Sequence, residues 1–306
     1  MEKKKENLKR FRSISEIHQA FGMPQPRHPL ISLTHFNESN PFNPETAPVY
    51  DVMEFYKIAF TAENHGKMKY GQNYYDFNEG SMVFIAPNQL FGSSEDRDEH
   101  SSYILLIHPD FFLGYPLANK IKQYGFFSYA VNEALHLSDD EKQIIISVYK
   151  IIELELNSRV DEFSQEVMIA QIELLLSYAN RFYNRQFVTR KILNNGLLQK
   201  LEAILDRHFS KEESLIQGIP TVQYIAGSLN TSPGYLSDML RSLTGQNTQQ
   251  HIHSKLIEKA KELLSTTNLT TGEVAYRLGF EHPQSFSKLF KAKTKVSPLE
   301  FRQSFN

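Results

Sequence analysis

The stretch YLSDMLRSLTG, residues 235–245, returns fifty residues later as SFSKLFKAKTK, residues 285–295. Both copies carry large apolar residues, a serine, a basic residue and a threonine at matching positions. Upstream, IAGSL at 225–229 matches VAYRL at 274–278 with an offset of 49, so the second copy has one extra residue between its helices. This repetition predicts that one structural unit occurs twice in the C-terminal part of the chain.

Each copy has the pattern of two helices joined by a tight turn. In the first copy, Ser232 suits an N-cap and Pro233 suits the first helical position. In the second copy, Gly279 can adopt a positive φ and end the first helix. Small residues in the first helices, Ala226 and Ala275, allow the second helices to approach closely. These features predict two helix-turn-helix units.

The predicted units span about residues 221–245 and 271–295, and a helical connector, NTQQHIHSKLIEKAKELL, joins them. A continuous connector would hold the two second helices so that they enter successive major grooves about 34 Å apart. Outward residues in the early turns would lie near base edges, and basic residues farther along would lie near phosphates. The predicted base-reading residues are Ser237, Asp238, Gln284, Ser287 and Lys288. The predicted phosphate-binding residues are Arg241, Lys291, Lys293, Lys295 and Arg302.

The charge distribution agrees with nucleic-acid binding by this region. Residues 217–306 carry ten Lys and Arg against six Asp and Glu, a net charge of +4. Because the whole chain has a net charge of -2, the remainder carries -6. Such asymmetry is typical of a polyanion-binding module joined to a module of another kind.

Residues 28–112 have the pattern of short strands. The segments VMEFYKIAF, NYYDFN, SMVFIAP and SYILLIH are rich in β-branched and aromatic residues, and turn-forming residues separate them. This pattern predicts a small β-barrel or sandwich. Phe55, Tyr74 and Phe84 are candidates for lining an effector pocket, although a small barrel more often uses its aromatic residues to fill the interior.

A helical pattern begins near Ser138. Ser138 and Glu141 have the spacing of a capping box, and two apolar stripes follow at helical spacing. These helices either cover the strands or pair two subunits, since a stripe shows burial and not the identity of the partner. The predicted organisation is a tail and sensing domain at 1–137, a helical hairpin at 138–182, a polar linker at 183–196 and a DNA-binding domain at 197–306.

The region from about Thr221 to Arg302 resembles the DNA-binding domain of the AraC/XylS family of bacterial transcription regulators. The resemblance rests on IAGSLNTSPGYLSDMLRSLTG, on the end of the connector, and on VAYRLGFEHPQSFSKLFKAKTKVSPLEFR. It implies an α+β protein with an N-terminal cupin-like β-barrel, a helical hairpin, and an all-α C-terminal domain with two helix-turn-helix units. FNEGSMVFIAPNQ, residues 77–89, is similar to a hairpin common in such barrels.

The resemblance also implies a function. Members of the family regulate transcription, more often as activators than as repressors. The implied partners are double-stranded DNA, RNA polymerase, a second copy of the chain and, as a candidate, a small-molecule effector. The implied location is the bacterial cytoplasm, in association with the nucleoid.

Four positions depart from the family pattern. Lys295 stands where the family usually has Gly, and Leu256 stands where an Arg is common in the connector. Gly234 and Asp238 stand where other members often have bulky or basic base-reading residues. The first unit is therefore expected either to read DNA weakly or to read cytosine.

The alternative function is a cupin-type metal-dependent enzyme fused to a nucleic-acid-binding module. Small β-barrels hold iron or manganese with His and carboxylate ligands, but the strand region contains no His-x-His pair. The chain has no Cys, which excludes thiolate zinc sites and a catalytic thiol. We therefore expect no catalysis, metal or cofactor. No signal peptide is expected after the basic start MEKKKENLKRFRS, and no membrane span is expected either.

Overall fold

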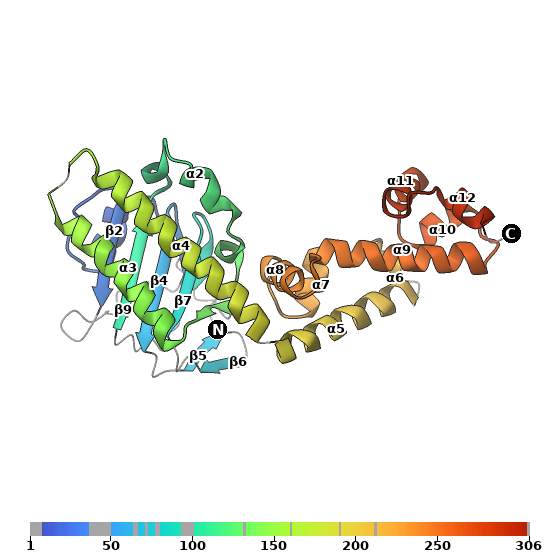
Figure 1. Ribbon diagram of the computed structural model, residues 1–306, viewed down its shortest axis with the longest axis horizontal. Coiled ribbons are helices and arrows are strands. Elements are labelled where there is room, and N and C mark those ends of the chain that lie inside the picture. Colours follow the sequence, from blue (N-terminus) through green and yellow to red (C-terminus); the bar gives the residue numbers. More distant parts are fainter. Residues whose placement is uncertain are drawn as a thin grey trace, which may run out of the picture. The chain divides into compact units, whose positions relative to one another are not determined.

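The computed structural model describes most of the chain as two compact units, residues 1–186 and 187–306. The first unit mixes strands and helices, and the second is helical throughout its described part (Figure 1). The described residues are 8–36, 50–63, 67–70, 73–76, 80–92, 101–130, 133–159, 161–189, 191–210 and 213–304.

A five-stranded antiparallel sheet forms the centre of the first unit, with the strand order β10-β7-β4-β9-β2. Its register places Phe60 opposite both Met82 and Tyr103, so that apolar side chains from three strands meet on one face. The strands are β2 (Ile31–Phe36), β4 (Tyr56–Glu63), β7 (Ser81–Ile85), β9 (Ser101–Ile107) and β10 (Leu135–His136).

Two smaller sheets accompany the central one. β1 (Leu8–Phe11), β3 (Tyr50–Met53) and β8 (Leu90–Gly92) form a three-stranded sheet, and β5 (Lys67–Tyr70) pairs with β6 (Asn73–Asp76). Within the described ranges, no ladder joins β2 to β10 or connects the sheets into a cylinder. The mixed helix-and-strand class is therefore confirmed, while the strands are seen as open sheets and not as a closed barrel.

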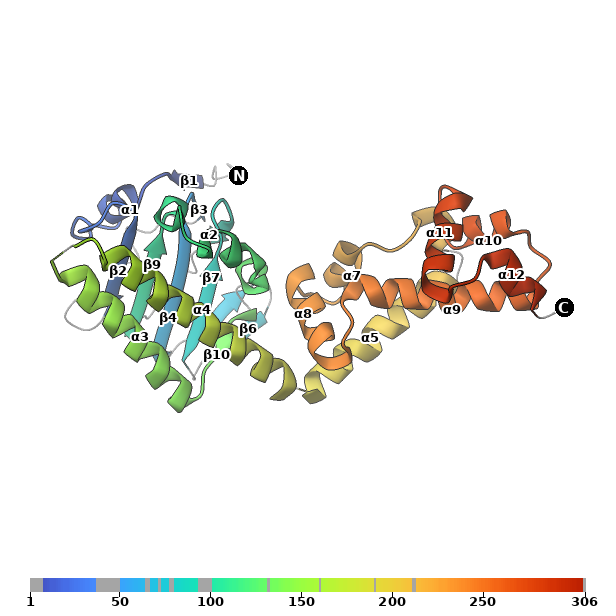
Figure 2. The ribbon, with the colours of Figure 1, turned by 45° about the horizontal axis from the view of Figure 1, so that its top comes forward.

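Two long helices, α3 (Asp139–Asn157) and α4 (Ser164–Thr189), lie across one face of the central sheet (Figures 1 and 2). α3 begins with the predicted capping box, in which Ser138 and Glu141 each bond to the other's backbone N–H. Tyr149 is fully buried between this helix and the sheet, where its ring stacks on those of Phe60 and Tyr103. The apolar stripe of α3 thus covers the strands, which was one of the two roles considered for it.

Short helices complete the first unit. The aromatic residues Phe111, Phe112, Phe126 and Phe127 in two of them are buried, and the last three contact the rings of Tyr56 or Phe84 of the central sheet. The helices are α1 (Ile14–Ala20), η2 (Pro109–Phe112), α2 (Leu117–Lys120), η3 (Ile121–Gln123) and η4 (Gly125–Ser128).

The segment predicted as a polar linker, residues 183–196, is largely helical. α4 continues to Thr189, α5 begins at Lys191, and the boundary between the two compact units falls after Gln186. Gln186 is buried, and its amide accepts from His136 N at 2.8 Å and donates to Ala134 O at 3.2 Å. Polar residues that look like a linker therefore satisfy the backbone around β10. Asn-Asn-Gly, predicted as a turn, lies inside α5.

In the second unit, two helix pairs are joined by one uninterrupted helix, α9 (Figure 1). The apolar side of α9 contributes Ile252 near the first pair and Leu256, Ala260 and Leu264 to the core of the second pair. The helices are α5 (Lys191–Ser210), α6 (Glu213–Gln217), α7 (Val222–Ser228), α8 (Pro233–Thr244), α9 (Thr248–Thr266), α10 (Thr271–Arg277), α11 (Pro283–Thr294) and α12 (Pro298–Gln303).

Candidate nucleic-acid interface

The two predicted helix-turn-helix units are present as α7–α8 and α10–α11, and their turns correspond residue by residue. Asn230 and Gly279 occupy the same place in the two turns, and both have a positive φ. α8 and α11 both begin with proline, and Ser232 caps α8 as predicted. The offset is 49 before the turn and 50 after it, which confirms the one extra residue in the second copy.

The structural repeat extends beyond the recognition helices α8 and α11. Thr244 Oγ1 donates to Leu240 O and Thr294 Oγ1 donates to Phe290 O, both at 2.8 Å. After each recognition helix the next helix begins with a capping box, formed by Asn247 and Gln250 in α9 and by Ser297 and Glu300 in α12. The start of α9 is therefore the counterpart of α12. The alignment of the two copies in the sequence did not extend to these helices.

The turn between α10 and α11 requires its glycine for a second reason. A Cβ on Gly279 would lie 2.6 Å from the carbonyl carbon of Gly218. The loop between α6 and α7, which contains Gly218, therefore packs directly against the turn. α6, which was not predicted as a separate helix, helps to hold the loop, because Ser214 Oγ donates to Arg277 O at 2.8 Å.

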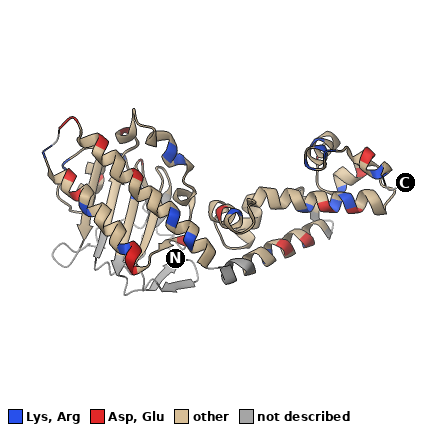
Figure 3. Ribbon diagram, viewed as in Figure 1, with Lys and Arg blue, Asp and Glu red and all other residues tan. Residues whose placement is uncertain are grey.

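The predicted contact residues of α11 lie on its outer surface. Gln284, Lys288, Lys291 and Lys293 are exposed, and Ser287 is half-buried. Figure 3 shows that the charged residues of this helix are all basic. The exposed lysines give α11 a positive charge, which suits contact with phosphates.

Lys295 ends α11 in the left-handed conformation, with φ 70°, at the position where Gly245 ends α8 with φ 75°. Its ammonium donates to Ala292 O at 3.4 Å. The departure from the usual glycine therefore leaves the backbone geometry of the repeat unchanged and adds an exposed positive charge at the end of the helix.

The first recognition helix differs, because two of its predicted contact residues bind each other. Arg241 Nη1 donates to Asp238 Oδ1 at 2.6 Å, one turn apart on α8. Ser237, predicted to read a base, instead shares a hydrogen bond of 3.0 Å with Thr248 Oγ1, and Thr248 is fully buried at the start of α9. Thr248 corresponds to Pro298 in the second copy, which has no hydroxyl to offer Ser287. The two equivalent serines therefore have different surroundings.

Arg302, predicted to bind phosphate, is placed against the protein instead. Its Nε donates to Leu264 O at 3.2 Å, and its Nη2 is buried without a hydrogen-bond partner in the described structure. Leu264 lies in the last turn of α9, where backbone carbonyls lack helical partners. Arg302 thus ties α12 to the end of α9, an arrangement that the sequence could not show.

Phe55 and Phe84, two of the three residues predicted for an effector pocket, are buried in the core. Phe55 is fully buried in a cluster with Phe11 and Met53, and Phe84 is buried against Phe126 and Phe127. Both are therefore core residues, in an interior whose side chains are closely packed. Tyr74 belongs to β6, and its side chain lies outside the described structure.

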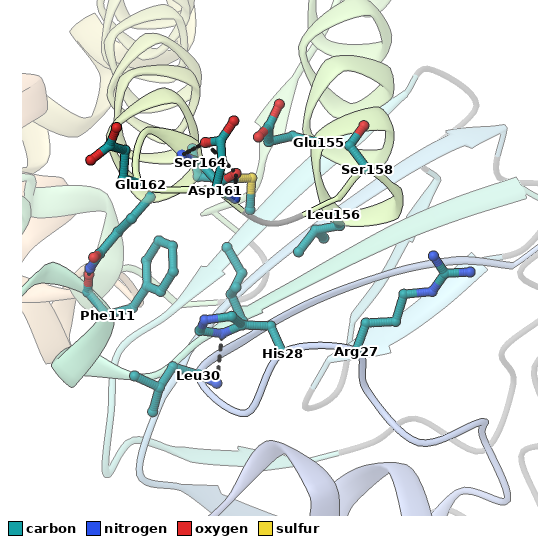
Figure 4. Close-up of a pocket in the computed structure, with 13 residues that line it drawn as sticks. Arg27, His28, Leu30, Phe111, Glu155, Leu156, Ser158, Asp161, Glu162 and Ser164 are labelled. Atoms are coloured by element: carbon teal, nitrogen blue, oxygen red, sulfur yellow. Dashed lines mark hydrogen bonds between the residues drawn. The ribbon is translucent and has the colours of Figure 1, made fainter.

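A cavity of about 470 Å³ lies elsewhere in the first unit, between residues 27–31, η2 and the ends of α3 and α4 that face each other (Figure 4). Leu30, Phe111 and Leu156 are among its apolar residues. Burial lowers the pKa of His28, and its Nδ1 accepts from Leu30 N at 3.1 Å, so the neutral ring carries its proton on Nε2. Arg27, Glu155 and Glu162 add charged groups. This volume is within the range of small-molecule sites.

The described residues also bear on two other kinds of feature, metal sites and membrane-spanning helices. In the described part of the chain, no three His, Asp or Glu side chains come together as metal ligands would. Among the described helices, none is long and apolar enough to cross a membrane.

Comparison with known proteins identifies the helical region. A helix-turn-helix domain family model matches residues 225–304. YfiF, an HTH-type transcriptional regulator of Bacillus subtilis, is 22% identical over 259 residues, which are 82% of this chain and 77% of YfiF. The transcriptional activator RhaS of an Enterobacter species is 32% identical over 110 residues, so the chain spans only 37% of the length of RhaS, and 36% of this chain is covered.

Among solved structures, the C-terminal domain of AraT, a response regulator from Geobacillus stearothermophilus, is 31% identical. The match covers 35% of this chain and 84% of that one, with a TM-score of 0.31. The relatives found by sequence are named as transcriptional regulators and activators, and not as enzymes. Residues 225–304 thus form a helix-turn-helix domain, and this match and the relatives support a transcription regulator of the AraC/XylS type.

Proposed function

We propose that the protein regulates transcription by placing α8 and α11 in two successive segments of the major groove of one DNA duplex. The observation that carries this proposal is the pair of equivalent helix-turn-helix units on a single helix. α9 has 19 residues and is therefore about 28 Å long. Successive major-groove segments on one side of a duplex are about 34 Å apart, which a connector of this length suits.

The roles of individual residues follow from their positions on the two helices. On α11, Gln284, Ser287 and Lys288 would read bases, while Lys291, Lys293 and Lys295 would bind phosphates. On α8, Asp238 would read a base and Arg241 would bind a phosphate. We leave Ser237 and Arg302 out of the DNA-contacting set, because their polar groups bond to Thr248 and Leu264.

The proposal extends to activation. RhaS relatives are named as activators, and we propose that this protein likewise activates transcription, in contact with RNA polymerase at the bacterial nucleoid. The first unit would act as a cupin-like sensing domain, and α3 and α4 would carry the contacts of a homodimer. The 470 Å³ cavity beside His28 is our candidate for the effector site.

The test is selection of bound DNA from a random pool with the full chain, at about 150 mM salt so that non-specific electrostatic binding is suppressed. We expect a motif of two short blocks about one helical turn apart. Replacing Gln284 with Ala should relax the preference at one base pair, whereas replacing Lys291 with Gln should weaken binding to all sequences alike. Failure to enrich any motif would contradict the proposal.

A further inference from the structure

The two recognition helices share one backbone geometry but carry different charge. Residues 233–245 contain one Asp and one Arg and are neutral, whereas residues 283–295 contain four Lys and no acidic residue, a net charge of +4. The difference falls on equivalent positions, since Asp238 corresponds to Lys288 and Arg241 to Lys291. The two recognition helices therefore present different charges to DNA.

The charges of α8 are also paired with each other. Arg241 and Asp238 form an ion pair of 2.6 Å, with 56% and 28% of their side chains exposed. While this pair is closed, the guanidinium is held by a carboxylate that would itself repel phosphates. In α11 the counterparts Lys288 and Lys291 are exposed, and neither is in an ion pair among the described residues. The pKa of Glu300 is lowered mainly by its hydrogen bonds to the N-cap residue of α12, and the charge of Lys291 lowers it to a smaller extent. The closed pair thus removes from α8 the electrostatic attraction that α11 retains.

We propose, building on the proposed function, that the ion pair makes Asp238 a cytosine-specific reader and makes the phosphate contact of Arg241 conditional on that cytosine. The N4 amino group of cytosine donates to carboxylates in the major groove. Adenine also offers an amino group, but its N7 acceptor lies beside it and would repel the carboxylate. When N4 takes the place of Arg241 Nη1 at Oδ1 of Asp238, the guanidinium turns to a neighbouring phosphate.

The opening of the pair is compatible with its exposure. Ion pairs between exposed side chains contribute little to stability. The Asp238 carboxylate can therefore exchange Arg241 for the N4 amino group of cytosine at little cost in free energy. At sites without the cytosine, Asp238 keeps Arg241 and α8 adds little to binding. The sequence-independent affinity then comes from the lysines of α11, and sequence discrimination at the first unit comes from Asp238.

The experiment combines DNA selection with the salt dependence of binding, using the full chain. Selection should enrich cytosine at one position of one block, and D238N should shift that position to adenine, since Asn pairs with adenine N6 and N7. On the selected site, the slope of log K against log salt should be steeper by about one than on a site with that cytosine replaced by thymine. In R241Q the two slopes should be equal.

K291Q is the matched control from the second copy. It should reduce the slope by about one on both DNA sites, because its phosphate contact does not depend on the cytosine. An equal loss of slope on both sites in R241Q would overturn the conditional contact, and an unchanged base preference in D238N would overturn the reading role. A motif that contains only the block read by α11 would overturn this inference and leave DNA binding intact, whereas no motif at all would overturn both.

Discussion

Single residues show how two copies of one backbone acquired different surfaces. Lys295 and Gly245 end equivalent helices with φ of 70° and 75°. Glycine adopts this conformation without strain, whereas a residue with a Cβ is disfavoured there by about 1 kcal/mol or more. The second copy therefore sacrifices some stability at a position where its side chain adds a positive charge to the proposed DNA-binding surface.

Replacing Lys295 with Gly should raise the free energy of unfolding by about 1 kcal/mol, because the left-handed backbone strain is removed. Urea denaturation would measure it as a higher midpoint with an unchanged slope. The same variant should bind DNA more weakly, since one phosphate contact is lost. The matched change, Gly245→Ala, should lower stability, and a stability loss in Lys295→Gly would contradict the argument.

The two equivalent serines predict opposite responses to truncation. Ser237→Ala removes the partner of the buried Thr248 hydroxyl and should destabilise the second unit by about 1–3 kcal/mol. Adding Thr248→Val removes the orphaned hydroxyl and should restore most of that loss. Ser287→Ala should leave stability unchanged, because its hydroxyl has no hydrogen-bond partner in the described structure, and should alter DNA preference.

Denaturation of the wild type, of Ser237→Ala, of Thr248→Val and of the double variant forms a double-mutant cycle. A coupling close to zero between positions 237 and 248 would show that the hydrogen bond contributes nothing. A change of DNA preference in Ser237→Ala with no change of stability would return Ser237 to the base-reading residues.

At the scale of elements, the end of α4 shows how a helix can end in polar residues and still be part of a core. Gln186 is 1% exposed, and its amide bonds to the backbone of residues 134 and 136. Arg185 reinforces the same contact, since it donates to His136 O at 2.7 Å and pairs with Glu141 of α3. The last turns of α4 therefore join β10 and α3 to one another.

Gln186→Ala should destabilise the first unit by about 2–3 kcal/mol, because the buried Ala134 O and the partly buried His136 N lose a partner. Asn184→Ala is the control from the same turn, because Asn184 is exposed and its one side-chain hydrogen bond within the described residues is to Asn180 O, one turn earlier. Thermal unfolding followed by circular dichroism would compare the two. Equal effects would mean that the end of α4 contributes only helix propensity and no tertiary contact.

For the whole molecule, the division into two compact units, each with its own buried core, has a thermodynamic consequence. We expect calorimetry of the full chain to resolve two unfolding transitions. Operator DNA at 100 times its Kd should stabilise the transition of residues 187–306 by about 2.7 kcal/mol and leave the other unchanged. Gln186→Ala assigns the transition of the first unit, since it should lower only that one. A single transition that DNA shifts as a whole would contradict independent units.

The sequence by itself determined the features that depend on contacts between near neighbours in the chain. The turns around Asn230 and Gly279, the prolines that begin α8 and α11, and the capping boxes of α3 and α12 all use partners within a few residues, so spacing alone predicts them. The helical periodicity of the repeat likewise predicted which side of each recognition helix is buried.

Only the tertiary structure decided which partner each polar side chain takes across long separations. Arg302 bonds to a carbonyl 38 residues away, and Gln186 to backbone groups about 50 residues away. Nothing in the local pattern distinguishes such a side chain from one that faces solvent or DNA, because the same donors suit a carbonyl, a phosphate or water. Whether Phe84 lines a cavity or fills the core is decided in the same way, by packing against residues distant in the sequence.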